Sequence, residues 1–139
     1  MKADVTWVGK RTFIGTTESG HSIAFGAAHG EDGAKPGPSP MELLLLGTGG
    51  CSAFDVVLIL ERGREPVTDV RVEIEAERAT TDPKVFVKLH LHFVIEGKGL
   101  NPAKVDRAVN LSIEKYCSAS AMMAATATLT HDYEIVDVS

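Results

Sequence analysis

The sequence predicts one α+β domain in which helices lie on the faces of antiparallel sheets. Two segments, 70–77 and 85–95, alternate apolar and polar residues, as half-buried strands do. A third segment, 41–60, is a nearly uninterrupted apolar stretch that follows a helix-start signal. The chain has 139 residues, which is enough for a single domain over 1–139 with its own core.

The expected order of elements is three strands, a helix, two strands, two helices and a strand. Alternation of apolar and polar residues places the first three strands near 2–7, 12–17 and 21–25. Glu-Ser-Gly at 18–20 is typical of a hairpin turn between the second and third strands. The segment 26–38 has no periodicity and several glycines and prolines, so we expect a loop there.

The long helix has a clear start and a clear end. Ser39-Pro-Met-Glu42 matches a capping box, in which Ser39 is the N-cap and Glu42 is the third helical residue. We expect the helix to reach about Arg62, because Gly63 can end it and a proline three residues later prevents continuation.

The two alternating segments predict a long hairpin with one solvated face. We expect the odd-numbered apolar residues of its second strand to point inward: Val85, Val87, Leu89, Leu91, Phe93 and Ile95. The register that the connecting turn predicts places Lys88 opposite Glu75 and His90 opposite Glu73. Pairing of charges across strands then explains the histidines better than a zinc site, which needs more ligands nearby.

The C-terminal third predicts two helices and one strand. Asn101 before a proline is a helix N-cap, and an apolar stripe continues to Tyr116. A short helix of small residues is expected over 118–126, with Cys117 near its start. The segment 129–138 reads as the final strand.

The apolar segment 41–60 is long enough to span a membrane. Asp55 argues against that, because a charge well inside a bilayer costs roughly 2.5–3.5 kcal/mol. A helix that is apolar all round needs more cover than one sheet can give. We therefore expect a homodimer in which this helix is central, with its glycines admitting a close neighbour. Cys51 lies beside the notch that Gly47 leaves.

Composition narrows the function classes. The net charge of −5 disfavours a nucleic-acid partner, because binding phosphates requires a basic surface. The N-terminal residues lack the apolar core of a secretory signal, so we expect a cytoplasmic protein with no membrane partner.

The two cysteines, Cys51 and Cys117, lie 66 positions apart. In the cytoplasm such a pair is rarely a structural disulfide. Two inert buried thiols, a redox pair and part of a metal site all remain open, because there is no CxxC motif and the spacing does not choose among them.

The residues around these cysteines resemble the OsmC/Ohr family of thiol peroxidases, most closely its YhfA-like branch. The resemblance rests on Ser-Pro-Met-Glu-Leu-Leu-Leu, then Gly-Gly-Cys51-Ser-Ala-Phe-Asp, and finally Glu-Lys-Tyr-Cys117-Ser. It implies an intertwined homodimer in which antiparallel sheets enclose a long buried central helix from each chain, with active sites at the subunit interface. It also implies reduction of organic hydroperoxides, in which Cys51 forms a sulfenic acid and Cys117 resolves it. No metal or cofactor is implied.

The family's peroxidases also place an arginine and a glutamate around the attacking thiol. The resemblance makes Arg11 and Glu42 the candidates, although Met41 stands at the position expected for the glutamate. Glu42 precedes Cys51 by nine residues, which is about 13.5 Å and half a turn off on a straight helix. Glu42 would therefore serve the partner's site or cap its own helix. Asp55, one turn after Cys51, would oppose thiolate formation.

Two functions follow from the sequence. The first is a cysteine-based peroxidase or related redox protein that acts on a small-molecule hydroperoxide. The alternative is a non-catalytic member that binds a small apolar or thiol ligand at the dimer interface. Cysteine-dependent metal handling is a remote third reading.

Overall fold

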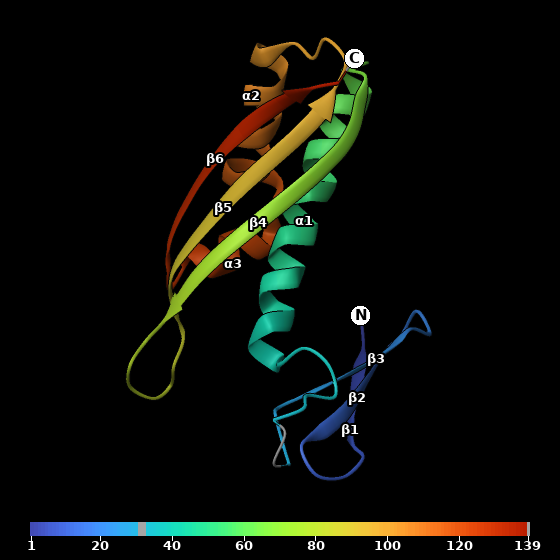
Figure 1. Ribbon diagram of the computed structural model, residues 1–139, viewed down its shortest axis with the longest axis vertical. Coiled ribbons are helices and arrows are strands. Elements are labelled where there is room, and N and C mark those ends of the chain that lie inside the picture. The colour runs from blue at the N-terminus through green and yellow to red at the C-terminus, as the bar shows by residue number, and fades with distance from the viewer. Residues whose placement is uncertain (31–32, 139) are drawn as a thin grey trace. The chain divides into compact units, whose positions relative to one another are not determined.

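The computed structural model describes residues 1–30 and 33–138 (Figure 1). Glu31, Asp32 and Ser139 lie outside the described residues, and with them part of the predicted loop at 26–38. The chain divides into two compact units, and the boundary between them falls within the longest helix of the chain.

The first unit, Met1–Leu45, holds a three-stranded antiparallel sheet. Its strands, in spatial order, are β1 (Ala3–Trp7), β2 (Thr12–Thr17) and β3 (Ser22–Gly26). The rings of Phe13 and Phe25, which face each other across β2 and β3, stack with centroids 5.9 Å apart. The three predicted strands are confirmed to within two residues.

Helix α1 spans Pro40–Arg62. Its first turn is a reciprocal capping box: the Glu42 amide donates to Ser39 Oγ at 3.2 Å, and the Ser39 amide donates to Glu42 Oε1 at 3.0 Å. At the other end the Gly63 amide donates to the Ile59 carbonyl at 2.9 Å, and Arg64 has a φ of 59°. The predicted start and end are both confirmed.

The second unit, Leu46–Ser139, holds the larger sheet and the remaining helices. Its strands are β4 (Val67–Arg78), β5 (Phe86–Gly97) and β6 (Thr128–Asp137), with β5 in the centre. Its helical elements are α2 (Pro102–Leu111), a π-helical turn (Ser112–Tyr116) and α3 (Ser118–Ala124). In Figure 1, α1, α2 and α3 lie on the same face of this sheet, which confirms the α+β class.

The expectation of purely antiparallel sheets is wrong for this unit. β4 and β5 pair antiparallel, but β5 and β6 pair parallel. The physical reason is the connection between β5 and β6, which passes through three helical elements and returns the chain to the starting end of β5. Such a crossover is the type of connection that parallel neighbours require.

The predicted hairpin register is wrong by two residues. Glu75 pairs with His90 and Glu77 pairs with Lys88, because the turn lies later in the chain than expected. The register also shifts between Glu77 and Arg78. A bulge of this kind reverses which side chains face inward at the end of a strand. Phe86 is therefore buried there, whereas the two predicted core residues Val85 and Val87 are 38% and 37% exposed.

The core of the second unit lies between the sheet and the helices. The buried side chains come from the centre of β5, from α2 and from one face of α1: Leu89, Leu91, Phe93, Ile95, Val105, Ala108, Val109, Val56 and Leu60. α1 approaches β4 closely, since a Cβ built on Gly49 would lie 2.8 Å from Ile74 Cδ1. The other face of α1 is open within this chain, since Phe54 on that face is 66% exposed.

By length and composition α1 qualifies as a membrane span. An 18-residue window in it has a mean hydropathy of 2.0, and 22% of that window is buried. The core helix of a soluble protein meets the same criteria. Because Asp55 lies inside this helix and one of its faces packs on β4, we interpret α1 as a core helix.

Candidate active site

The fold brings the two cysteines of the chain together. Cys51 lies in the middle of α1, and Cys117 lies at the junction between the π-helical turn and α3. Their sulfur atoms and a carboxylate oxygen of Asp55 all lie within 4.8 Å of one another. Both cysteines are free thiols. Residues that are 66 positions apart in the sequence therefore form one cluster, which we call the thiol cluster: Cys51, Asp55 and Cys117.

Cys117 reaches this position because the helix breaks there. Its backbone is extended, with φ −74° and ψ 101°, and its amide donates to the Ser112 carbonyl at 2.7 Å. The sulfur then acts as the N-cap of α3. It accepts hydrogen bonds from the Ser120 amide at 3.3 Å and from the Ser120 hydroxyl at 3.0 Å. The predicted position of Cys117 at the start of the last helix is confirmed.

A second set of contacts links the two elements that carry the cysteines. The Ser112 hydroxyl, on the π-helical turn, donates to the Ser52 carbonyl at 2.9 Å and lies 3.4 Å from Asp55 Oδ2. The Ser52 hydroxyl donates to the Gly49 carbonyl at 3.0 Å. Ser52 and Ser112 are fully buried. The bond between Ser112 and Ser52 holds the π-helical turn, which precedes Cys117, against α1, whereas the bond between Ser52 and Gly49 lies within α1.

The two thiols differ in environment. Cys117 is only 2% exposed, whereas Cys51 is half-buried. Burial raises the pKa of the Cys117 thiol, hydrogen bonds from Ser120 oppose that increase, and the adjacent Cys51 sulfur adds to it. Cys117 is therefore a protonated thiol at neutral pH. A reagent from solution meets Cys51 first.

The other two predicted site residues lie in the first unit, whereas the thiol cluster lies in the second. Glu42 is engaged by its own helix: a backbone hydrogen bond from Ser39, above all, holds the pKa of the Glu42 carboxyl below its ordinary value. Lys35 Nζ also approaches Glu42 Oε1 at 3.4 Å. The capping role of Glu42 is thus confirmed. Arg11 lies just before β2, after the turn at Gly9 and Lys10, and its catalytic role remains a prediction.

Sequence reasoning identified Asp55 as a neighbour of Cys51 but missed Ser112 and Ser120. The available signal for Ser120 was its position three residues after Cys117, since an N-cap side chain accepts from that amide. Ser112 had no local signal. The sequence placed Ser112 only within the apolar stripe that continues to Tyr116. Its contacts arise because the π-helical turn packs against α1, which is far away in the sequence.

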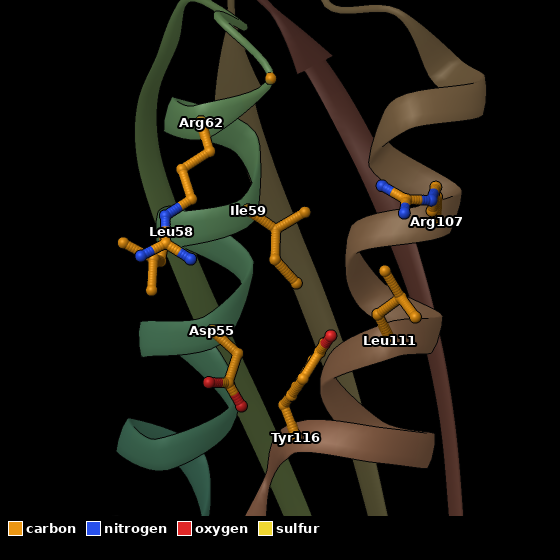
Figure 2. A pocket seen from close by; sticks show the side chains of 8 residues that line it. Asp55, Leu58, Ile59, Arg62, Arg107, Leu111 and Tyr116 are labelled. Atoms are coloured by element: carbon orange, nitrogen blue, oxygen red, sulfur yellow. The ribbon is translucent and has the colours of Figure 1, made fainter.

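A cavity of about 360 Å³ adjoins the thiol cluster and shares Asp55 with it. Figure 2 shows Arg62 of α1 and Arg107 of α2 on opposite walls, with Asp55 and Tyr116 toward one end. The remaining lining residues are largely apolar: Leu58, Ile59, Gly63 and Leu111. The cavity thus combines apolar walls with two cationic groups, which is typical of a site for a small amphiphilic ligand.

The histidines of β5 have partners, but not the predicted ones. Asp132 of β6 lies between them, with its Oδ1 2.7 Å from His92 Nδ1 and 3.0 Å from His90 Nε2. The hydrogen bond with Asp132 raises the pKa of His92, and the same bond lowers the pKa of Asp132. The histidines do pair with a carboxylate on a neighbouring strand, as predicted. That carboxylate comes from β6, however, and not from β4.

Comparison with known proteins agrees with this geometry. The family described as "OsmC-like protein" matches residues 30–132. Protein YhfA of Escherichia coli strain K12 is 46% identical over 136 residues, which cover 98% of both chains.

Solved structures give the same result. The crystal structure of a hypothetical protein from Aquifex aeolicus VF5 has a TM-score of 0.85 at 30% identity, covering 99% of this chain and 97% of that one. An organic hydroperoxide resistance protein OsmC from Legionella pneumophila has a TM-score of 0.63 at 20% identity, covering 99% and 96%. At that identity the likeness establishes the fold alone. With the match over residues 30–132 and the identity to YhfA, the chain belongs to the OsmC-like family.

Proposed function

We propose that this protein is a thiol-dependent peroxidase that reduces organic hydroperoxides, with Cys51 as the attacking and Cys117 as the resolving cysteine. The observation that carries the proposal is the proximity of the two sulfur atoms, within 4.8 Å, in a member of the OsmC-like family. The difference in burial supports these roles, because Cys51 is half-buried and Cys117 is nearly inaccessible.

The chemistry requires two steps. The Cys51 thiolate attacks the terminal oxygen of the hydroperoxide and the O–O bond breaks. That oxygen stays on Cys51 as a sulfenic acid, and the other oxygen takes up a proton and leaves with the organic group as an alcohol. The Cys117 sulfur then displaces water from that sulfenic acid and forms a disulfide. The two Ser120 donors stabilise the Cys117 thiolate as its proton leaves. An external dithiol returns both cysteines to the reduced state, and a cytoplasmic location would supply such reductants.

A disulfide has a sulfur–sulfur distance of about 2.05 Å, so the sulfurs must approach. Cys117 lies at a break between two helical elements rather than inside a helix, which allows its side chain to move. Asp55 adds a negative charge beside the pair. Such a charge disfavours two adjacent thiolates and keeps one of the thiols protonated.

The test is consumption of cumene hydroperoxide with a lipoyl or other dithiol as electron donor. We expect turnover by the wild-type protein and none by Cys51→Ser. Without the dithiol, Cys117→Ser should consume one hydroperoxide per chain and then stop, because no second thiol of the chain forms the disulfide. Arg11→Ala and Glu42→Gln test the two remaining site assignments. If both retain full turnover, Arg11 and Glu42 have no catalytic role.

The second candidate is a non-catalytic protein that binds a small apolar or thiol ligand, and the cavity beside Asp55 favours it. A ligand that remains bound through purification and is retained by Cys51→Ser would support this function over the peroxidase. We expect Arg62→Ala and Arg107→Ala to weaken the binding of an acidic ligand, whereas an exposed arginine outside the cavity, Arg71, provides the control.

We also propose that the protein is a homodimer in which the open face of α1 packs against its copy. This face carries the exposed Phe54 together with the open notch at Gly47. At 100° per residue, Gly47 and Phe54 point away from the buried Val56 and Leu60. An apolar helix face of this kind is the usual mark of a protein interface.

A further inference from the structure

We propose that Cys51, Asp55 and Cys117, in the reduced protein, form a binding site for a thiophilic divalent cation, with zinc as the natural choice. The site uses residues of the proposed peroxidase but does not depend on that activity. Each of the three side chains offers one ligand atom, and these atoms lie within 4.8 Å of one another. They come from two elements, α1 and the break before α3, and the buried hydrogen bond from the Ser112 hydroxyl to the Ser52 carbonyl ties the turn before that break to α1.

The distances suit zinc with small adjustments. With bonds of about 2.3 Å to sulfur, two thiolates on a tetrahedral zinc ion are about 3.7 Å apart. The observed upper limit of 4.8 Å exceeds this by about 1 Å, which side-chain rotation at half-buried Cys51 and Asp55 can supply. The backbone of α1 does not have to move, because Cys51 and Asp55 are one turn apart on the same helix.

The chemistry of the ligands selects the metal class. Two thiolates and a carboxylate favour zinc and its softer analogues over magnesium and calcium, which prefer oxygen ligands. Three protein ligands leave a fourth tetrahedral position. Cys51 and Asp55 are only half-buried, so water can fill that position.

The groups around the three side chains are those that an outer shell requires. The Ser120 amide and hydroxyl both donate to Cys117 Sγ, and donors to a ligating sulfur stabilise its thiolate form. The Ser112 hydroxyl donates to the Ser52 carbonyl at 2.9 Å and also lies 3.4 Å from Asp55 Oδ2, so it is a polar neighbour of the carboxylate. These polar neighbours of Asp55 and Cys117, Ser112 and Ser120, are thus themselves buried parts of the fold.

A consequence is that metal binding and disulfide formation exclude each other. A bound ion holds both sulfurs as thiolates, whereas a Cys51–Cys117 disulfide leaves neither sulfur able to ligate. Oxidation by a hydroperoxide would convert two metal-bound thiolates, one hydroperoxide and two protons into a disulfide, an alcohol, water and the free metal ion. The ion would therefore protect the thiols against slow oxidation.

The test uses the full-length reduced protein after treatment with a chelator. Titration with Co²⁺ should give the charge-transfer bands of thiolate ligands and the visible bands of a tetrahedral site. These bands should saturate at one ion per chain, and added Zn²⁺ should displace the bound Co²⁺. Cys51→Ser and Cys117→Ser should abolish these bands. Asp55→Asn should weaken binding more than tenfold, and Ser120→Ala should weaken it by about tenfold.

The matched control is Glu114→Gln, which removes an exposed carboxylate on the π-helical turn outside the cluster. It should bind Co²⁺ as the wild type does. Circular dichroism of each variant separates loss of binding from loss of folding. Blocking both thiols with methyl methanethiosulfonate gives a second loss-of-binding sample without any mutation.

Absence of thiolate bands in the wild-type protein would overturn the proposal. So would binding that survives both cysteine substitutions, or that is lost in His92→Ala, which would place the metal on the histidines of β5 instead. The outcome is separate from that of the peroxidase. A protein that binds Co²⁺ through its cysteines but does not consume hydroperoxide would refute only the proposed function.

Discussion

Replacing Phe54 with alanine tests the role of the open face of α1. The Phe54 side chain is 66% exposed within this chain. A phenylalanine buries about 150–250 Å², so roughly two-thirds of that, about 100–170 Å², is available to a second copy. At about 25 cal/mol per Å², covering it is worth roughly 2.5–4 kcal/mol for each protomer.

Because the contact occurs twice in a symmetric dimer, its loss has an upper limit of about 5–8 kcal/mol. Buried area converts only partly into affinity. We therefore expect Phe54→Ala to raise the dimer dissociation constant by at least about 100-fold, which corresponds to about 2.7 kcal/mol. The fold of one chain should be unaffected, because alanine favours a helix more than phenylalanine does and Phe54 is not in the core.

The assay is sedimentation velocity over a dilution series, with circular dichroism to check folding. Met122→Ala is the control, because Met122 is 75% exposed and lies on another helix, α3. A wild-type chain that is monomeric throughout the series would refute the dimer. A dimer that is equally stable in Phe54→Ala would show that association uses another surface.

Three further predictions follow from the contacts of the second unit. Iodoacetamide should label native Cys51 before Cys117, which is 2% exposed, and peptide mapping by mass spectrometry measures the order. Asp132→Asn should lower the melting temperature more at about pH 5 than at about pH 8.5, because the pair with His92 is charged on both sides only between the lowered pKa of Asp132 and the raised pKa of His92. Gly49→Ala should change the free energy of unfolding by less than about 1 kcal/mol in urea, since only the terminal Cδ1 of Ile74 has to move and the gain in helix propensity of about 1 kcal/mol offsets that cost.

The sign of the pH effect follows from the directions of the two shifts. The raised pKa of His92 adds stability that is fully present below the ordinary histidine value of 6.5 and is lost as the pH rises through the folded value. The lowered pKa of Asp132 adds stability that is present above 3.8 and is lost as the pH falls. Equal effects of Asp132→Asn at both pH values would contradict this pairing. Equal labelling rates for the two thiols, or a loss of more than about 2 kcal/mol in Gly49→Ala, would contradict the other two predictions.

Local sequence signals predicted the elements of this fold well. Ser39 and Glu42 fixed the start of α1 because both partners of a capping box lie within four residues of each other. Gly63 and the following residues fixed its end in the same way. Alternation also identified the centre of β5, where Leu91 and Phe93 are fully buried.

Long-range pairing was beyond those signals. The parallel pairing of β6 with β5 depends on how three helical elements cross over, and no residue of β6 encodes it alone. The bulge near Arg78 reversed the inward face at the start of β5, since one extra residue changes the phase of alternation. Asp132 is a partner of His92 only because of that parallel pairing.

For the candidate site, the family resemblance assigned roles to the two cysteines. Their spacing in the sequence had left those roles open. What joins them is the hydrogen bond from Ser112 to the Ser52 carbonyl, a contact between residues 60 positions apart. A single sequence carries no trace of such a contact. The shared position of Asp55, between the thiol cluster and the cavity, likewise follows from packing alone.

The most direct test of the central claim is intact-mass analysis and peptide mapping after one equivalent of cumene hydroperoxide. The account predicts that the wild-type chain loses two hydrogens and yields a peptide pair joined through Cys51 and Cys117. It predicts that Cys117→Ser gains one oxygen on Cys51 instead. A wild-type chain whose two thiols remain unmodified would contradict the account.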